Sequence, residues 1–498
     1  MGKKLPALVF LAFLFFNLLF ASGHIGADGF ASYLTAESIV LDHDLSILGV
    51  RHFDVPELSR GAHYIGSVGR DSRKYSQYGI SLPAIEAPFY FIGNMVSSFS
   101  GKGLHDYVCM LFVSFADCFV SALLCLAVLL FAFELSGDKR TALAIALLFG
   151  LGSFFLPQMR YGYSEPLLAL GFLLTVFFLS RLERNGDGRA PLFAGLAFGI
   201  ALLTKHYVVL FYPLLLIYCV AGSHRNKRNL WTDLLSFHAF VAVSLAAFFL
   251  LNYYRFGSIL ETGYKDISHD FMPAYFLRGF IGQLFSPGKS IFLYFPACFA
   301  FLYLVPQMLR KHRNLTLLVL AVIVISILFY SPYVDWNGDV GWGVRYQIIL
   351  LPLIAVMLGG VLSNLKFIYF LTAVGFAVNL PALIINMADW NYLVFNVIRN
   401  GDLFYYDPRF SPVVGGWIQL ASLVKRCLTG NSLSVSYLGK LYPVAGFDRI
   451  DIWYFTILIK DGVPFTLKIA AAGAALALLL ALSVCICLIK KETRARTA

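Results

Sequence analysis

The chain has 498 residues, of which 59% are hydrophobic and only 13% are charged, and its formal net charge is +11. Soluble globular proteins are about 45–50% apolar and about 25% charged, so this composition excludes a protein that buries its apolar side chains in one aqueous core. It predicts an all-α integral membrane protein, because a helix satisfies its own backbone hydrogen bonds in lipid. The basic residues lie in short clusters between apolar runs, a pattern typical of membrane topology and not of nucleic-acid binding.

Apolar runs suited to membrane-spanning helices recur along the whole chain. A span needs roughly 20 apolar residues, because the hydrocarbon layer is about 30 Å thick. The sequence predicts about twelve spans, at 5–22, 107–135, 141–157, 165–182, 190–204, 206–222, 232–252, 290–309, 315–331, 346–363, 366–387 and 467–489. The first run also resembles a cleavable signal peptide, but its length favours an uncleaved helix.

The loops between these runs alternate in charge. The basic clusters are GDKR, RLERNGDGR, SHRNKRN, RKHRN and the tail KKETRARTA. Because cytoplasmic loops carry an excess of Lys and Arg, these loops and both termini are predicted to be cytoplasmic. The opposite side of a cell membrane then receives residues 23–103, 253–289, 332–345 and 388–466, which hold most of the polar and aromatic loop sequence.

This asymmetry predicts three parts and places the functional face outside the cytoplasm. Residues 1–387 form a transmembrane domain with the external loop 23–103. Residues 388–466 form a small external segment, helical or mixed, whose aromatic residues suit packing more than sugar binding. Residues 467–498 are a last span with a basic cytoplasmic tail.

The sequence predicts neither a disulfide framework nor a metal site. Most of the eight cysteines lie in or beside apolar runs and lack zinc-site spacing. Four histidines share the first external loop with carboxylates, but no i,i+4 or HExxH spacing supports a metal, and no cofactor is predicted. These histidines are His24, His43, His52 and His63.

The first external loop begins with an acidic residue and continues with bases. Asp28 precedes GFASYLTAESIVL, which predicts an amphipathic helix in the membrane interface, although Glu37 falls on its apolar face. Arg73, Lys74 and Tyr78 follow later in the loop. An acid and cations at the bilayer surface suit a reaction on a lipid phosphate, since the carboxylate accepts a proton and the cations stabilise the phosphate. The simpler interpretation of Asp28 is a helix cap.

The order of these residues resembles that of a known family. ADGFASYLTAESIVLDHDL at 27–45 resembles the acidic residue, tyrosine and "dgDl" turn that follow the first helix of GT-C glycosyltransferases, which are polytopic enzymes that use polyprenyl-phosphate sugars. The resemblance is closest to the branch of the protein O-mannosyltransferases and the aminoarabinose transferase of lipid A. Later segments are similar in the same order: YSQYGISLPAIEAPFY (75–90), YGYSEPLLAL (161–170), NYYRFGSILETGY (252–264), GQLFSPGKSIFLYFP (282–296), DWNGDVGWGVRYQIILLP (335–352) and FSPVVGG (410–416). Two departures are Gly29, where many relatives have a second acid, and Val344 in the "GpRY" motif.

The resemblance implies an inverting glycosyltransferase with Asp28 as the general base. It would move a sugar from a polyprenyl-phosphate carrier to a glycan, lipid or protein acceptor on the extracytoplasmic face. Glu165 would be the second catalytic acid, and Arg73, Lys74, Tyr78, Lys205 and Arg345 would bind the donor phosphate or sugar.

Structural interpretations of these residues stay open beside the functional ones. Glu165 suits a helix first turn, Lys205 suits a snorkelling turn residue, and Arg345 suits an interfacial anchor. For the whole chain the alternatives are a transporter or lipid flippase of envelope assembly and a non-catalytic membrane scaffold. A transporter predicts charges within spans and repeat symmetry, whereas the spans here are nearly free of charge.

Overall fold

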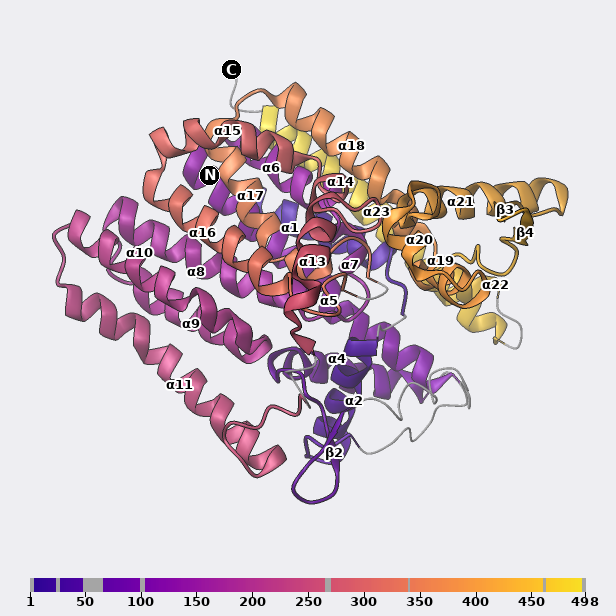
Figure 1. The fold of residues 1–498 in the computed structure, drawn as a ribbon, viewed down its shortest axis with the longest axis horizontal. Helices are drawn as coiled ribbons and strands as arrows, with labels where there is room; N and C mark the ends of the chain where they lie inside the picture. Colours follow the sequence, from indigo (N-terminus) through magenta and orange to yellow (C-terminus); the bar gives the residue numbers. More distant parts are fainter. Residues whose placement is uncertain are drawn as a thin grey trace.

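The computed structural model describes residues 4–23, 27–47, 66–98, 104–264, 270–338, 341–459 and 463–494. Helices form nearly all of the regular structure in these ranges, and the strands within them pair as two short antiparallel hairpins, β1–β2 and β3–β4. The long helices gather into one bundle, from which the segment around α19 to α22 extends to one side (Figure 1). The all-α membrane class predicted from the sequence is confirmed.

The N-terminal half contains α1 (Lys4–Leu19), α2 (Ala27–Leu41), β1 (Ser67–Val68), β2 (Lys74–Tyr75), α4 (Ser81–Ser97), α5 (His105–Ser136), α6 (Lys139–Gly152), α7 (Phe155–Gln158), α8 (Glu165–Asn185), α9 (Ala190–Thr204), α10 (Tyr212–Arg225) and α11 (Leu230–Phe256). The C-terminal half contains α13 (Phe276–Phe285), α14 (Ile291–Tyr294), α15 (Ala297–Lys311), α16 (Arg313–Tyr330), α17 (Leu350–Val361), α18 (Leu365–Ile384), α19 (Met387–Tyr392), α20 (Gly401–Tyr406), α21 (Pro412–Thr429), β3 (Ser434–Tyr437), β4 (Lys440–Pro443), α22 (Trp453–Ile459) and α23 (Phe465–Arg494).

Each of the twelve apolar runs coincides largely with helix, but the helices differ in length. Among the described residues, seven helical segments are long and apolar enough to cross a membrane, and α1, α9 and α17 are shorter apolar helices. The seven are α5, α8, the segment His206–Arg225 that ends in α10, α11, α16, α18 and α23. The chain is therefore a multi-pass membrane protein, and the count of about twelve spans stays a prediction.

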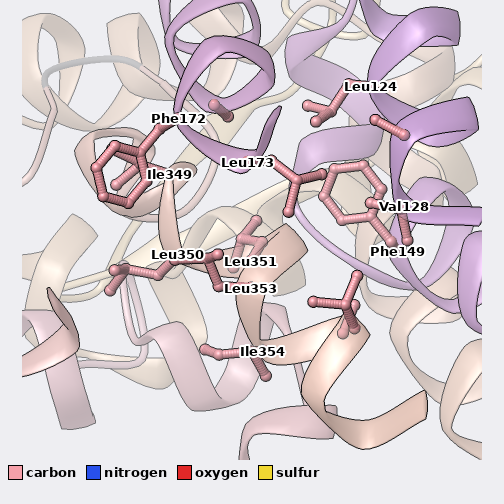
Figure 2. Packing of buried hydrophobic residues seen from close by; sticks show 14 of the residues in the cluster. Leu124, Val128, Phe149, Phe172, Leu173, Ile349, Leu350, Leu351, Leu353 and Ile354 are labelled. Atoms are coloured by element: carbon pink, nitrogen blue, oxygen red, sulfur yellow. The ribbon is translucent and has the colours of Figure 1, made fainter. Parts of the chain in front are cut away.

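The centre of the bundle is built where α5, α8 and α17 meet. Leu350 to Gly360 of α17 are all buried, and α17 packs against α5, α8 and α15. Figure 2 shows side chains of α17 facing Phe172 and Leu173 of α8 and Leu124 and Val128 of α5. A helix that is apolar on all sides is stable only when it is enclosed, which is why α17 takes this place.

The outermost helices expose apolar side chains over most of their length. Large exposed residues include Leu235 and Leu250 on α11, and Leu476 and Leu480 on α23. Soluble proteins rarely expose continuous apolar surfaces of this extent, so lipid is the medium in which these faces are stable.

The helix predicted after Asp28 forms, but its surroundings differ from the prediction. The residues of α2 from Gly29 to Ser38 are buried, and α2 packs against α4. Glu37 lies inside this contact and accepts a hydrogen bond of 2.9 Å from the Tyr90 hydroxyl. The predicted lipid-facing side of this helix is therefore absent from Gly29 to Ser38, because protein covers both faces there, and its level relative to the membrane interface stays a prediction. Most of the large apolar side chains exposed in the described part of this loop are on α4, for example Phe91 and Met95.

Candidate active site

Four separate elements bring charged side chains together at one end of the bundle, which we call the site end. Asp28 lies in the first turn of α2, and Glu165 is the first residue of α8. Lys205 directly follows α9, and Arg345 begins a short turn before α17. Since α8 begins and α9 ends here, the charges lie at helix ends and not within the apolar length of a span.

These four side chains form one chain of ion pairs. The Nη2 atom of Arg345 is 2.7 Å from the Oδ2 atom of Asp28. The Nζ atom of Lys205 donates to the Oε1 atom of Glu165 at 2.7 Å. The Nε atom of Arg345 is 4.0 Å from the same Glu165 oxygen, which joins the two pairs. Two carboxylates thus balance two cations.

Tyrosines surround this cluster. The Tyr78 hydroxyl donates to the Oδ1 atom of Asp28 at 2.7 Å, so both carboxylate oxygens of Asp28 have partners. The Arg345 guanidinium lies over the rings of Tyr163 and Tyr346, at 4.4 and 5.1 Å from their centroids. These rings hold the cation by cation–π attraction and restrict where it can move.

Exposure separates the four charged groups into an inner and an outer set. The side chains of Glu165 and Arg345 are 2% and 5% exposed, whereas those of Lys205 and Asp28 are 15% and 22% exposed. Three buried atoms of the inner pair have no hydrogen-bond partner, namely Nε and Nη1 of Arg345 and Oε2 of Glu165. Buried polar atoms are normally paired, so the two arginine donors and the carboxylate acceptor can serve a ligand.

Opposing effects set the pKa of Asp28. Burial raises the pKa of this carboxyl, but the charges of Arg345 and Lys205 and the hydrogen bonds from Tyr78 and Arg345 lower it more strongly. The net result is a pKa below the ordinary value, and Asp28 is ionised at neutral pH.

Two glycines make room for Arg345. Gly338 has a φ of +71°, and a Cβ atom there would lie 2.7 Å from the Cγ atom of Arg345. A Cβ atom on Gly341 would lie 3.0 Å from the Cδ atom of Arg345. The buried Lys289 donates from Nζ to the Gly341 carbonyl at 2.5 Å. This loop is therefore shaped around the arginine side chain.

Tyr78 is positioned by contacts from two membrane helices. Arg255 at the end of α11 donates to the carbonyls of Ser76 and Tyr78, at 2.8 and 3.1 Å. Gly79 lies against the last carbonyls of α9, where a side chain would clash with the Leu203 oxygen. The loop after β2 is thus held between α9 and α11, beside the site.

A crevice opens next to Tyr78. Leu202, Leu203, Phe248 and Leu251 form its apolar walls. The polar residues that line it are Gln77, Tyr78, His206, Asn252, Arg255 and Thr262. It lies between α9, α11 and the loop 77–80.

Five of the seven residues predicted from the sequence meet at this site: Asp28, Tyr78, Glu165, Lys205 and Arg345. Arg73 instead contacts Asp44 and Asp71, while Lys74 pairs with Val68 in the β1–β2 hairpin. Their role as donor ligands stays a prediction.

Several residues that shape the site were not singled out from the sequence. Tyr163 and Tyr346 are direct neighbours of motif residues, and their aromatic character next to Glu165 and Arg345 was the available signal. Arg255 was visible as a lone arginine in the last turn of an apolar run. Arginine at that place is costly in lipid unless it has a partner, and the carbonyls of Ser76 and Tyr78 provide it.

The cysteines and histidines were also considered as reactive or metal-binding groups. Each of the eight cysteines is a free thiol, and only Cys427 and Cys487 are exposed. Among the residues that the structure describes, no three His, Cys, Asp or Glu side chains gather as a metal site would require. Of the four histidines considered for such a site, His24, His52 and His63 lie outside the described residues.

Comparison with known proteins adds one finding to this geometry. Residues 106–332 match the model of glycosyltransferase family 87, which covers somewhat less than half of the chain. The matched part includes Glu165 and Lys205, whereas Asp28, Tyr78 and Arg345 lie outside it. No curated protein and no solved structure matches the chain. The matched part of this multi-pass protein is therefore similar to a glycosyltransferase family.

Proposed function

We propose that the protein transfers a sugar from a polyprenyl-phosphate carrier to an acceptor hydroxyl on a glycan, lipid or protein. The observation that carries this proposal is the pair of Asp28 and Arg345, in which an accessible carboxylate adjoins a buried cation with two free donor atoms. Such a transfer needs a carboxylate that takes the proton of the acceptor hydroxyl and a cation that stabilises the leaving phosphate. The family match supports the reaction class, and the motifs resemble the protein O-mannosyltransferase branch.

The reaction is a single displacement with inversion. The acceptor oxygen attacks the anomeric carbon while the bond from that carbon to the phosphate oxygen breaks. Asp28 takes the acceptor proton, and polyprenyl phosphate leaves with the electron pair of the broken bond. Arg345 and Lys205 stabilise the negative charge that grows on the departing phosphate.

The exposures of the two acids support different roles for them. Asp28 is the outer acid, with 22% of its side chain exposed, so it is the acid that an acceptor can reach and is assigned as the base. Glu165 is enclosed and contacts both cations, so it orients Lys205 and Arg345 toward the phosphate. Tyr78 fixes the Asp28 carboxylate through its hydroxyl.

The low pKa of Asp28 fits this order of events. A carboxylate with a lowered pKa is a weak base. A weak base is sufficient here, because the acceptor hydroxyl becomes acidic as its oxygen bonds to the anomeric carbon, and the proton is removed late in the reaction. A donor phosphate would also compete for Arg345 and weaken its hold on Asp28. The pKa of Asp28 then rises when the donor is bound, which strengthens the base at the moment of use.

The crevice beside Tyr78 suits the carrier lipid. Its walls of Leu202, Leu203, Phe248 and Leu251 are apolar, as a polyprenyl chain requires, but its volume is only about 20 Å³, so it would have to widen to admit the chain. Arg255 and His206 line the same crevice, and His206 directly follows Lys205 in the chain. A carrier entering from the bilayer would bring its phosphate to Lys205 and Arg345.

The charge pattern of the loops supports an orientation for this site. With the basic loops and both termini in the cytoplasm, the site end faces the extracytoplasmic side of a cell membrane. A lipid-linked donor fits that compartment, since nucleotide sugars are bound by domains for which the basic loops are too short.

The test is a transferase assay on purified protein in liposomes. A panel of polyprenyl-phosphate sugars is offered with an envelope extract as acceptor source, and donor consumption is followed. The wild type is expected to consume one donor, and Asp28→Asn is expected to lose this activity. Asp402→Asn, at an exposed acid far from the cluster in sequence, is the matched control. Consumption that persists in Asp28→Asn would reject Asp28 as the base, and lipid flipping without consumption would reject the transferase.

A further inference from the structure

The helix α21 has the reverse of the polarity expected for a helix on a soluble surface. Its buried positions are small or polar, while large apolar residues stand exposed. The buried positions include Gly415, Gly416, Gln419 and Ser422. The exposed apolar residues are Val414, Trp417, Val424 and Leu428, and their spacing of three, seven and four forms one stripe along the helix. Leu428 is 79% exposed.

Specific contacts hold the small and polar face inward. Gly415 lies against the Trp390 ring so closely that a Cβ atom would clash with it, and Gln419 donates from Nε2 to the Phe447 carbonyl. Ser422 accepts a hydrogen bond of 3.0 Å from the Leu433 amide at the start of the β3–β4 hairpin. The helix therefore cannot rotate to bury its apolar stripe.

The start of α21 adjoins the end of a membrane-spanning helix. A Cβ atom on Gly416 would lie 2.7 Å from the Cβ atom of Pro381, in the last turn of α18. From there α21 runs sideways and away from the bundle, with the β3–β4 hairpin beside its far end (Figure 1). The first residues of the exposed apolar stripe, Val414 and Trp417, therefore lie close along the chain to a contact with the end of a membrane-spanning helix.

The far end of this surface combines apolar and basic side chains. Lys425 is exposed between Val424 and Leu428. At the hairpin tip, Leu438 and Leu441 are 83% and 73% exposed, and the exposed Lys440 lies between them. Leu441 and Tyr442 are neighbours in β4 and point to opposite faces of the hairpin, and Tyr442 packs on the cluster around Trp390. Leu441 therefore faces away from the protein.

We infer that α21 and the tip of the β3–β4 hairpin dock on the bilayer, as an interfacial helix and an inserted loop. An apolar stripe with tryptophan near its start and lysine near its end is what helices in the membrane interface carry. The lysines at 425 and 440 match anionic lipid phosphates. A second protein would cover a patch of limited length, whereas this stripe runs the length of the helix and begins at a membrane span.

This docking has a consequence for the candidate site. The segment that α21 holds to the membrane includes Phe404 and Tyr405, and the Gly288 amide donates to the Tyr405 carbonyl at 3.1 Å. Lys289, which supports the loop of Arg345, lies over the Phe404 ring at 5.7 Å. The docked segment thus braces one wall of the Arg345 loop. The docking itself does not depend on the transferase reaction.

Spin labels on α21 test this inference directly. Cys427 and Cys487 are first replaced by serine, which leaves six buried cysteines. Labels are then placed by Val424→Cys and Leu428→Cys in the full chain, reconstituted in phosphatidylcholine and phosphatidylglycerol liposomes. Leu480→Cys on α23 is the lipid reference, and Asp402→Cys on α20 is the water reference. The accessibility of each label to oxygen and to a water-soluble nickel complex is measured.

The expected result at 424 and 428 is high oxygen and low nickel accessibility, as at Leu480. High nickel accessibility at both positions, as at Asp402, would show that water covers the helix and would overturn the inference. Low accessibility to both reagents would show a protein contact, with a partner or a second copy, and would also overturn it. Since both substitutions are at exposed positions, the fold is preserved and each outcome is decisive.

Discussion

Arg345 and Asp28 form an ion pair of 2.7 Å that joins the loop before α17 to the first turn of α2. The two residues are far apart in the sequence and belong to separate elements of the fold. This pair supplies the carboxylate with a cation and leaves Nε and Nη1 of the guanidinium free. It is the relationship from which most of the expected behaviour of the site follows.

Replacement of Asp28 should remove catalysis without unfolding the protein. We expect Asp28→Asn to lower kcat by about 10²–10⁴-fold, which is the usual contribution of a general base. The amide keeps the size of the side chain and can still accept from Tyr78. Steady-state kinetics in liposomes measure the effect, and a thermal transition near that of the wild type confirms the fold. A kcat within a factor of about three of the wild type would assign the base to another group.

Lys205 should act on donor binding more than on the acceptor. We expect Lys205→Met to raise the donor KM and to lower kcat, because the phosphate loses one cation in both the ground state and the transition state. Lys205→Arg should restore part of the activity because it keeps the charge. An unchanged donor KM in Lys205→Met would place the phosphate elsewhere, and Arg73→Met is the comparison variant for that outcome.

The pH dependence of activity should follow the lowered pKa of Asp28. Ionised Asp28 is the active form, and its pKa lies below the ordinary value, which is about 3.9 for aspartate. The wild-type kcat/KM should therefore show no acid limb between about pH 5 and 7. In Arg345→Gln the burial of Asp28 persists while its main counter-charge is gone, so the acid limb should move to higher pH.

The lowered pKa of Asp28 also affects the free energy of unfolding. Because the pKa of Asp28 is lower in the folded chain than in the unfolded one, the ionised carboxylate stabilises the fold at neutral pH. That stabilisation is lost as the pH falls through the folded-state pKa.

For the activity profile, an acid limb of kcat/KM at the same pH in the wild type and in Arg345→Gln would contradict the role of Arg345 in setting the pKa of Asp28.

Gly338 should be needed for the placement of Arg345. Its φ is +71°, and an added Cβ atom would lie 2.7 Å from the arginine Cγ atom. We expect Gly338→Ala to lower kcat/KM by at least about 10-fold, because the guanidinium is displaced from Asp28. Gly137→Ala is the matched control, since Gly137 has a φ of +72° and open space around it. Both variants share the backbone cost of about 1–2 kcal/mol, and only Gly338→Ala should lose activity.

Glu86, a buried acid that contacts α2, is expected to be protonated in the folded protein at neutral pH. Its Oε2 atom accepts from the Ser32 hydroxyl at 2.5 Å, its Oε1 atom has no partner, and burial together with the charge of Asp117 raises its pKa. A raised pKa in a folded acid means that the folded state keeps the proton at neutral pH while the unfolded state releases it. Glu86→Gln should therefore raise the free energy of unfolding by about 1 kcal/mol or more at pH 7. A lower thermal transition for Glu86→Gln at this pH would contradict the protonated state.

Much of the fold was determined by the sequence alone. The apolar runs predicted the positions of the helices, because hydrophobic length and the need for internal backbone hydrogen bonds leave few other structures in lipid. The acid after the first run is conspicuous because charged residues beside apolar runs are costly, whereas the SEP and GVRY turns were singled out by their resemblance to GT-C motifs. The family match over residues 106–332 agrees with the reaction class that these motifs indicated.

The tertiary structure decided how these pieces combine. Sequence alone presented α2 as an amphipathic interfacial helix, but packing against α4 encloses it, and Glu37 is satisfied by Tyr90, which is distant in the sequence. It also grouped Arg73 with the donor ligands; in the structure Arg73 pairs with Asp44 and Asp71, and its role toward the donor stays a prediction. Long-range pairings of this kind depend on the arrangement of helices in three dimensions, which a local pattern does not encode.

Local composition therefore accounts for the membrane environment, the helices and the kinds of charged residue at their ends. Packing of distant segments accounts for the pairing of Asp28 with Arg345, the pairing of Glu165 with Lys205, and the outward-facing apolar stripe of α21. The physical reason is that burial and helix formation follow from local composition, whereas ion pairs follow from which helix ends are brought within a few ångströms of one another.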